Sequence, residues 1–285
     1  MKNDPIRFVF FGTPVFAVGV LDELEKHKIV PSLIIATPDK PRGRKLIVTP
    51  PEVKVWAEKR AIPVFQPQKL DETAVQKLKA ENAELFIVAA YGKLIPKSIL
   101  EIPKHGSLNV HPSLLPKLRG ASPIQSSILT EDKTGVTIML VDEEMDHGPI
   151  VAQKEFFELP WPPKASALQA ALAKIGGEML VEVLPKYIRG EIVPKPQAHT
   201  GVTYTKKIEK TDGLIDLLDD AEKNFRKIQA FDIWPRAHFF RESRGKKMRV
   251  IVVDAEMRDK KLIITKVLPE GQNEMTYEEF LRRNS

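Results

Sequence analysis

Asn109 and His111 are the residues whose types and spacing most clearly fit chemistry. They stand two positions apart in residues 107–111, a segment that predicts a β-strand. Because successive side chains of a strand alternate between its two faces, both point to the same side. An amide beside an imidazole would stabilise an oxyanion and move a proton, the two requirements of acyl transfer. A strand end capped by hydrogen-bonded polar residues is the competing interpretation.

A histidine in such a role also needs a carboxylate that orients its ring. The acidic turn over residues 142–148, between two predicted strands, offers the candidates Asp142, Glu143, Glu144 and Asp146. Acidic turns are more often solvated than catalytic, so the pattern alone does not choose among them. The spacing of the His, Asp and Glu residues predicts no metal site.

The composition narrows the chemistry further. The 285 residues include no cysteine, which excludes disulfide scaffolds, thiolate metal centres and thiol nucleophiles. The 44 Lys and Arg residues exceed the 38 Asp and Glu residues, and the net charge of +6 permits a nucleic-acid partner without requiring one. The apolar runs have only strand length and the first residues lack a secretory pattern, so we expect a cytoplasmic protein without membrane contact.

The candidate catalytic residues need a fold that brings the ends of strands together. Helical patterns alternate with continuous apolar strands, which we expect near residues 6–11, 32–37, 64–65 and 85–90. This alternation predicts an α/β domain with a predominantly parallel, doubly wound sheet. Ligands of such sheets bind beyond the carboxyl ends of the strands, where Asn109 and His111 lie. The turn after the first strand lacks the glycine spacing of a dinucleotide site, so we expect neither NAD nor ATP.

Several ordered motifs together resemble one protein family. They include Ser-Leu-Asn-Val-His-Pro-Ser-Leu-Leu-Pro at residues 107–116, Arg-Gly-Ala at 119–121 and Met-Asp-His-Gly-Pro-Ile at 145–150. With residues 10–18 and 37–41, they resemble the folate-dependent formyltransferases, and among these the branch that acts on methionyl-tRNA. The match runs over residues 5–235. It implies a Rossmann-like formyltransferase domain followed by a small β-rich domain similar to a shortened oligonucleotide-binding (OB-like) barrel.

The resemblance also implies a reaction and its residues. The formyl group of 10-formyltetrahydrofolate, a co-substrate, would pass to the free α-amine of methionyl-initiator tRNA for translation initiation. The implied catalytic residues are Asn109, which binds the oxyanion, and His111, which handles the amine proton while Asp146 orients it. Folate contacts are implied at eight further positions, Ala89, Ala90, Tyr91, Gly92, Ser113, Leu114, Leu115 and Pro116. His147 stands where we expect a small residue and would add a contact to the pocket.

Two basic segments bear on the acceptor substrate. Residues 40–45 hold four cations in six residues, and a second basic cluster occupies residues 236–249. A solvated run of charges is the simplest interpretation of such a segment. The resemblance instead implies contacts with tRNA. The implied tRNA-binding residues are Arg42, Arg44, Lys45, Lys246 and Lys247.

The expected domain organisation follows from the same resemblance and from a stretch rich in Pro, Gly and Thr, whose composition is typical of a linker. We predict a catalytic domain over residues 1–189, a linker over residues 190–208 and a shortened OB-like, tRNA-binding domain over residues 209–285. We expect a monomer that binds the folate donor and methionyl-initiator tRNA and needs no metal.

Three other functions remain open at this point. They are a formyltransferase acting on an amino-sugar nucleotide, a hydrolase that splits formyl-folate, and an RNA-binding module that has kept only the fold. The basic segments favour tRNA over a sugar nucleotide, which needs no extended positive surface. The presence of Asn109, His111 and Asp146 together argues against a binding module.

Overall fold

The computed structural model describes residues 6–43, 46–243 and 245–284, without the side chains of Arg42, Ser243 and Lys246. Within this part the chain forms two compact units. The first unit takes in the chain up to Ala121 with Thr134–Phe156 and Gln169–Tyr204, and the second takes in Ser122–Lys133, Phe157–Leu168 and the chain from Thr205 onward. None of the described helices is long and apolar enough to cross a membrane.

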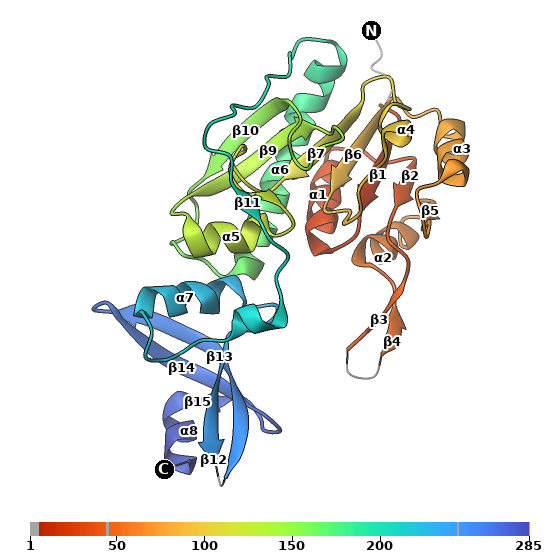
Figure 1. The fold of residues 1–285 in the computed structure, drawn as a ribbon. Helices are drawn as coiled ribbons and strands as arrows, with labels where there is room; N and C mark the ends of the chain where they lie inside the picture. Colours follow the sequence, from red (N-terminus) through yellow and green to blue (C-terminus); the bar gives the residue numbers. More distant parts are fainter. Residues whose placement is uncertain (1–5, 44–45, 244, 285) are drawn as a thin grey trace. The chain divides into compact units, whose positions relative to one another are not determined.

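The first unit is built on a seven-stranded sheet with the order β10-β9-β7-β6-β1-β2-β5 (Figure 1). Its five parallel strands are β1 (Phe8–Gly12), β2 (Leu33–Ile35), β5 (Val64–Phe65), β6 (Leu85–Ala89) and β7 (Ser107–His111). Two antiparallel strands, β9 (Thr134–Leu140) and β10 (Ile150–Phe156), extend the sheet beyond β7. The prediction of a predominantly parallel α/β sheet is confirmed.

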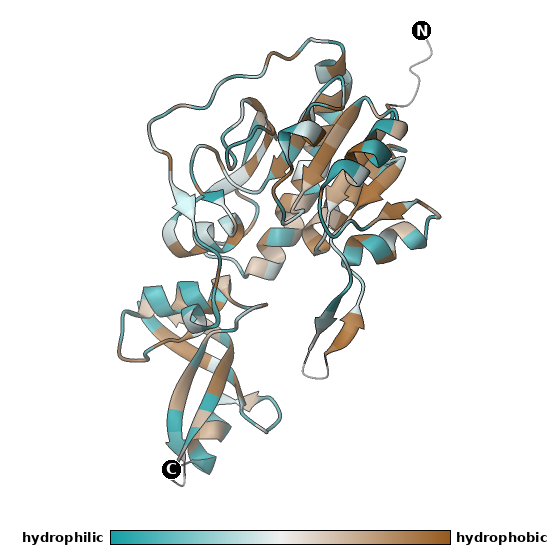
Figure 2. Ribbon diagram, turned by 45° about the vertical axis from the view of Figure 1, so that its right-hand side comes forward, coloured by the Kyte–Doolittle hydropathy of each residue, from teal (hydrophilic) through white to brown (hydrophobic). Residues whose placement is uncertain are grey.

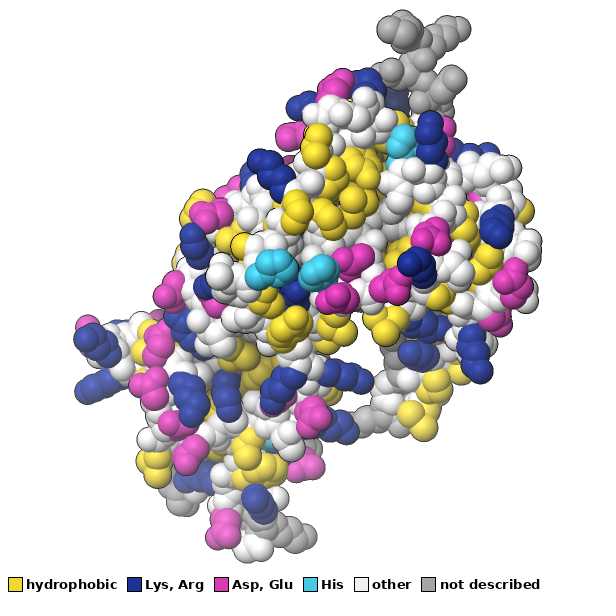
Figure 3. Space-filling model, turned by 45° about the horizontal axis from the view of Figure 1, so that its top comes forward, with side chains coloured by type: hydrophobic (Ala, Val, Ile, Leu, Met, Phe, Trp, Pro, Cys, Tyr) yellow, Lys and Arg dark blue, Asp and Glu magenta, His cyan; other side chains and the backbone are white. Residues whose placement is uncertain are grey.

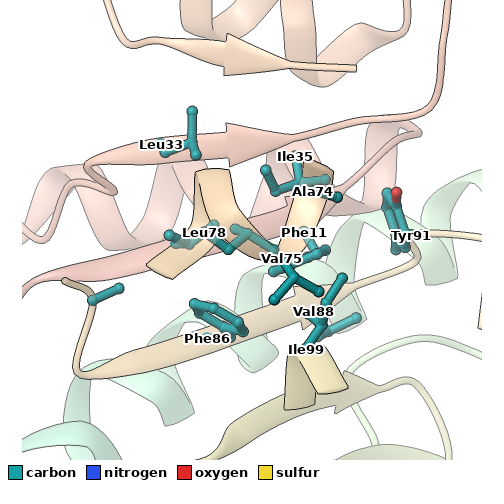
Figure 4. Packing of buried hydrophobic residues seen from close by; sticks show 12 residues of the cluster. Phe11, Leu33, Ile35, Ala74, Val75, Leu78, Phe86, Val88, Tyr91 and Ile99 are labelled. Carbon is teal, nitrogen blue, oxygen red and sulfur yellow. The ribbon is translucent and has the colours of Figure 1, made fainter. Parts of the chain in front are cut away.

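Helices cover both faces of this sheet, and the parallel strands β1, β2, β5 and β6 therefore contain no polar side chain. On one face, α1 (Val15–Lys26) and α6 (Ala165–Ile188) pack closely together through small residues, since a Cβ on Gly19 would lie 2.8 Å from that of Ala173. On the other face, α3 (Glu72–Ala80) and α4 (Lys97–Leu100) supply Val75, Leu78 and Ile99 to a buried cluster with the strands (Figure 4). Because helices cover the sheet, a shift of one residue in the pairing of a strand would move its buried side chains to the wrong face, so the register is fixed.

The strand order reverses between β1 and β6. The chain runs from β1 outward to β2 and β5, then returns to place β6 and β7 on the other side of β1. The carboxyl ends of β1 and β6 are paired there through Gly12 and Ala89. Gly12 is needed for space, because a Cβ would lie 2.6 Å from the Phe10 ring and 2.7 Å from Ala17. In open α/β sheets this reversal is where ligands bind.

Residues 38–51, which include the first basic segment, contain a β-hairpin. β3 (Lys40–Arg42) pairs antiparallel with β4 (Ile47–Thr49). Figure 2 shows β3 as hydrophilic and β4 as hydrophobic. The sequence did not reveal the hairpin because each strand has only three residues, too few for an alternating pattern.

The second unit combines an antiparallel sheet with helices. The sheet has the order β12-β13-β14-β15. Its strands are β12 (His238–Ser243), β13 (Lys246–Arg258), β14 (Lys261–Pro269) and β15 (Met275–Thr276), and the helices are α5 (Pro123–Thr130), α7 (Ala221–Ala230) and α8 (Tyr277–Arg283). The C-terminal β-rich region is confirmed, whereas its OB-like closure stays a prediction.

Candidate active site

His111 ends β7 and is buried at the carboxyl edge of the sheet. Its Nε2 lies 3.1 Å from the backbone oxygen of Leu118. Because a carbonyl oxygen only accepts hydrogen bonds, Nε2 carries the hydrogen of this contact. Nδ1 lies 3.6 Å from Oδ1 of Asp146. The ring therefore faces the carboxylate through Nδ1.

Asp146 lies in the turn between β9 and β10 and has a left-handed backbone, with φ of 49°. Its Oδ2 accepts a hydrogen bond from the backbone N–H of Gly120 at 2.7 Å. Leu118 is left-handed as well, with φ of 60°. Non-glycine residues take this conformation at a cost in free energy that the surrounding contacts must offset, and such positions cluster at functional sites.

Asn109 precedes His111 by two residues on the same face of β7, as the strand pattern predicted. It is half-buried and is paired through its backbone register with Val88 of β6 and Met139 of β9. Among the described residues its side-chain amide has no hydrogen-bond partner. The amide and the imidazole thus line one edge of the sheet.

The structure separates the acidic candidates of the turn. Asp142 binds His147, with 2.7 Å between its Oδ2 and Nδ1, and Glu143 pairs with Lys97 at 2.8 Å. Only Asp146 among the four is paired with His111 in the described structure. Within the described residues, no three His, Asp or Glu side chains gather as metal ligands.

The segment after β6, where we expected folate contacts, alternates between buried and exposed residues. Ala89 is buried, whereas Ala90 and Gly92 are exposed and left-handed, with φ of 48° and 80°. The ring of Tyr91 packs edge-on against Phe11 with 5.4 Å between centroids, and burial raises the pKa of the Tyr91 hydroxyl to about 12. The backbone at Ala90 and Gly92 is thus the part of this segment that a ligand can reach.

The second expected folate segment, Ser113 to Pro116, is fixed by hydrogen bonds. The Ser113 hydroxyl donates to the backbone oxygen of Lys117 at 2.7 Å. The backbone oxygen of Leu115 accepts from Gln153 at 2.9 Å. Leu114 and Pro116 are the partly exposed residues of the segment. Its polar atoms hold the loop in place, and its partly exposed surface is apolar.

The β3–β4 hairpin carries the first basic segment. Asp39, directly before β3, accepts hydrogen bonds from Lys54 of α2 (Glu52–Glu58) at 2.8 Å and from Gln66 at 2.7 Å. These bonds hold the pKa of the Asp39 carboxyl below its ordinary value. Arg44 and Lys45 lie outside the described residues, and Arg42 is described in its backbone alone.

In the second basic segment, Lys247 lies over the ring of Phe240, with 4.5 Å from Nζ to the ring centroid. The other predicted residue of this segment, Lys246, begins β13. The structure describes its backbone only.

Comparisons with known proteins identify the family of the chain. The family model described as formyl transferase matches residues 6–184. A methionyl-tRNA formyltransferase of Chloroflexus aurantiacus is 45% identical over 250 residues, which cover 86% of this chain and 79% of the relative. One from Thermodesulfovibrio yellowstonii is 39% identical over 293 residues, covering 96% and 94%. A solved sugar N-formyltransferase from a Shewanella species shares the fold with a TM-score of 0.64, at 18% identity and with 86% and 96% covered. The chain belongs to the formyl transferase family.

Proposed function

We propose that the chain is a methionyl-tRNA formyltransferase, which transfers the formyl group of 10-formyltetrahydrofolate to the free α-amine of methionyl-initiator tRNA. The observation that carries this proposal is the similarity to relatives of that name. The relative from Thermodesulfovibrio yellowstonii matches this chain over 96% of its length, so both compact units are included in the match.

The reaction needs a nucleophile, an oxyanion and a proton acceptor. The amine nitrogen attacks the formyl carbon, a C–N bond forms, and the formyl oxygen becomes an oxyanion. Collapse of this intermediate breaks the bond between the formyl carbon and N10 of the folate. The amine loses one proton and N10 gains one, so the transfer consumes no further reactant.

In this proposal Asn109, His111 and Asp146 act as one catalytic group. The Asn109 amide donates to the oxyanion, a kind of contact worth roughly 100- to 1,000-fold in rate. His111 receives the amine proton, directly or through a water, and Asp146 orients the ring and balances its charge. The 3.6 Å separation of His111 Nδ1 from the Asp146 carboxylate supports these roles.

The folate donor is placed by this proposal at the carboxyl ends of β6 and β7. The exposed backbone of Ala90 and Gly92 supplies polar groups for the pterin, and Leu114 and Pro116 supply apolar contact. Ala89, Tyr91, Ser113 and Leu115 are buried and shape these segments from behind. The site lies beside the reversal in strand order, where open α/β sheets bind ligands.

Initiator tRNA is the second substrate in the proposal. On the face that Figure 3 presents, positive and negative side chains are interspersed, so no broad basic surface marks the tRNA site there. We therefore assign tRNA contacts to particular basic elements, the residues at 42–45 and at 246–247.

The proposal also covers the oligomeric state and the compartment. We propose that the protein is a monomer in the cytoplasm, where charged initiator tRNA is used. The proposal further includes the division into a catalytic domain over residues 1–189, a linker over 190–208 and an OB-like tRNA-binding domain over 209–285.

An assay with two acceptors tests this function. The purified protein is given 10-formyltetrahydrofolate with methionyl-initiator tRNA, or with an amino-sugar nucleotide, and the formylated product is measured. We expect formylated methionyl-tRNA alone. Formylation of the sugar nucleotide alone would replace the proposal, and release of formate without either product would indicate a hydrolase.

A further inference from the structure

Gln197 joins the two loops that hold the His111–Asp146 pair. Its Nε2 donates to the backbone oxygens of Asp146 and Gly148, at 2.9 Å each. Its Oε1 accepts from Nε and Nη2 of Arg119, at 3.1 and 2.6 Å. One side chain therefore binds the Asp146 turn on one side and the segment after β7 on the other.

The partners of Gln197 fix the orientation of its amide. Arg119 has only donors and must face Oε1, whereas the two backbone oxygens only accept and must face Nε2. A carboxylate at this position would keep the acceptor for Arg119 but would present an oxygen, instead of a donor, to Asp146 and Gly148. Gln197 is 7% exposed, so water does not readily replace the missing donor.

Arg119 lies between the two residues that contact the catalytic pair directly. The backbone oxygen of Leu118 binds His111, and the backbone N–H of Gly120 binds Asp146. Arg119 is itself buried, with 5% of the residue exposed. By anchoring it, Gln197 fixes the backbone from which both contacts are made.

The chain around Gln197 is fixed on both sides of the residue. Lys195 and Ile150 exchange two backbone hydrogen bonds, at 2.7 and 2.8 Å. Thr203 accepts from the backbone N–H of Leu118 through its hydroxyl at 2.8 Å, and from that of Arg119 through its carbonyl at 2.9 Å. Residues 195–203 thus pack along the active-site loops, although they follow the matched family region at residues 6–184.

We propose that Gln197 is a positioning residue for formyl transfer, which holds the Asp146 carboxylate against His111 through Arg119 and the backbone of the Asp146 turn. Gln197 touches no reacting atom. Its role is to support the left-handed conformation of Asp146, which is unfavourable without outside contacts. The inference rests on the proposed function, because it assigns the pair at His111 to the transfer step.

Two substitutions of Gln197 test the inference. Gln197→Glu keeps the acceptor and removes the donor, and Gln197→Met keeps the volume and removes both. We expect kcat for formylation to fall by about 10- to 100-fold in each, since displacement of a catalytic group by about 1 Å has effects of this size. The KM values for folate and tRNA should stay within about threefold of the parent, because the interaction that is removed acts on the transition state.

Gln229→Met is the matched control. Gln229 is a glutamine of similar burial, 8% exposed, on α7 of the second unit. This variant should keep the parent kcat. The dependence of kcat on pH should also change shape in the Gln197 variants and not in the control, because a displaced carboxylate alters how the His111 ring takes up protons. Thermal unfolding of each variant, measured beforehand, sets an assay temperature at which all are folded.

A spectroscopic readout separates this inference from the proposed function. The nitrogen resonances of the His111 ring, measured by ¹H–¹⁵N NMR, should shift in Gln197→Glu and Gln197→Met but not in Gln229→Met. A parent that fails to formylate methionyl-tRNA overturns the proposed function, and the NMR comparison still tests the positioning. Parent-like kcat and unchanged His111 resonances in the folded Gln197 variants would overturn the role of Gln197.

Discussion

Two parts of the first unit, the active-site loops and the β3–β4 hairpin, are held in opposite ways. Around His111 and Asp146 the polar contacts are buried or part-buried and are made to a neighbouring loop, as in the bond from His111 to the Leu118 oxygen and the bond from the Gly120 N–H to Asp146. The hairpin is exposed, and its apolar residues Leu46, Ile47 and Val48 are 70%, 62% and 65% exposed. Its described side-chain anchor is at its base, where Asp39 binds Lys54 and Gln66.

The difference matches two separate demands of the proposed reaction. Stabilising a transition state requires groups fixed to a fraction of an ångström, which buried hydrogen bonds between loops provide. Capturing a large polyanion requires cations that reach out and adapt, which an exposed hairpin provides. Damage to the loops should therefore appear in kcat, and damage to the hairpin in KM for tRNA.

The largest effect is expected from the catalytic pair itself. His111→Ala should lower kcat by about 100-fold or more, the size of effect seen when an acid–base group or an oxyanion donor is removed. Asp146→Asn and Asn109→Ala should reduce kcat by the same order. Single-turnover formylation of methionyl-tRNA measures the effect, with circular dichroism to confirm that the variants are folded. Turnover near the parent value in His111→Ala would show that the His111–Asp146 pair takes no part in the mechanism.

The arrangement of Asn109, His111 and Asp146 was predictable from the sequence only in part. The segment ending in Asn109-Val110-His111 predicted β7 with its observed bounds. The alternation of strands and helices likewise predicted the sheet. These signals are local, so a single sequence carries them.

The rest of the site depends on contacts between distant segments. The turn offered four carboxylates, and the left-handed backbone that turns Asp146 toward His111 has no pattern of its own. Gln197 contacts residues 51 and 78 positions away, from a segment rich in proline and glycine that predicted only a linker. Its amide partners follow from tertiary packing, which no local signal encodes.

A moderate effect is expected from the first basic segment, which begins in β3. Replacing Arg42, Arg44 and Lys45 together by alanine should raise KM for tRNA by about tenfold and leave folate binding unchanged. Each phosphate that is no longer neutralised by a cation should also reduce the slope of log affinity against log salt by about 0.9. Formylation measured at two salt concentrations checks both expectations, with the folate KM as the internal control. A fall in kcat alone would mean that the hairpin positions the substrate for catalysis. The contrast between the active-site loops and the hairpin would then be wrong.

A smaller effect is expected at the base of the same hairpin. Asp39→Asn keeps a side chain of the same size but removes the ion pair with Lys54. Since partly exposed ion pairs contribute little, KM for tRNA should rise by no more than about fivefold, with kcat unchanged. The matched control is Glu101→Gln, which removes an exposed carboxylate beside Lys97 on α4 and should leave both parameters at the parent values. A change in folate KM would show that Asp39 supports the folate site and not the hairpin alone.

The smallest effect is expected from the apolar residues of the hairpin. Ile47→Ser and Val48→Ser should change the free energy of unfolding by no more than about 0.5 kcal/mol, because exposed side chains lose little packing on substitution. Ile87→Ser in β6 is the contrasting case, since this side chain is fully buried and its removal leaves a cavity and an unpaired hydroxyl. Urea unfolding of the three variants measures the difference. A destabilisation above about 1 kcal/mol in the hairpin variants would mean that the free protein packs these side chains, and the hairpin would then belong with the rigid part of the molecule.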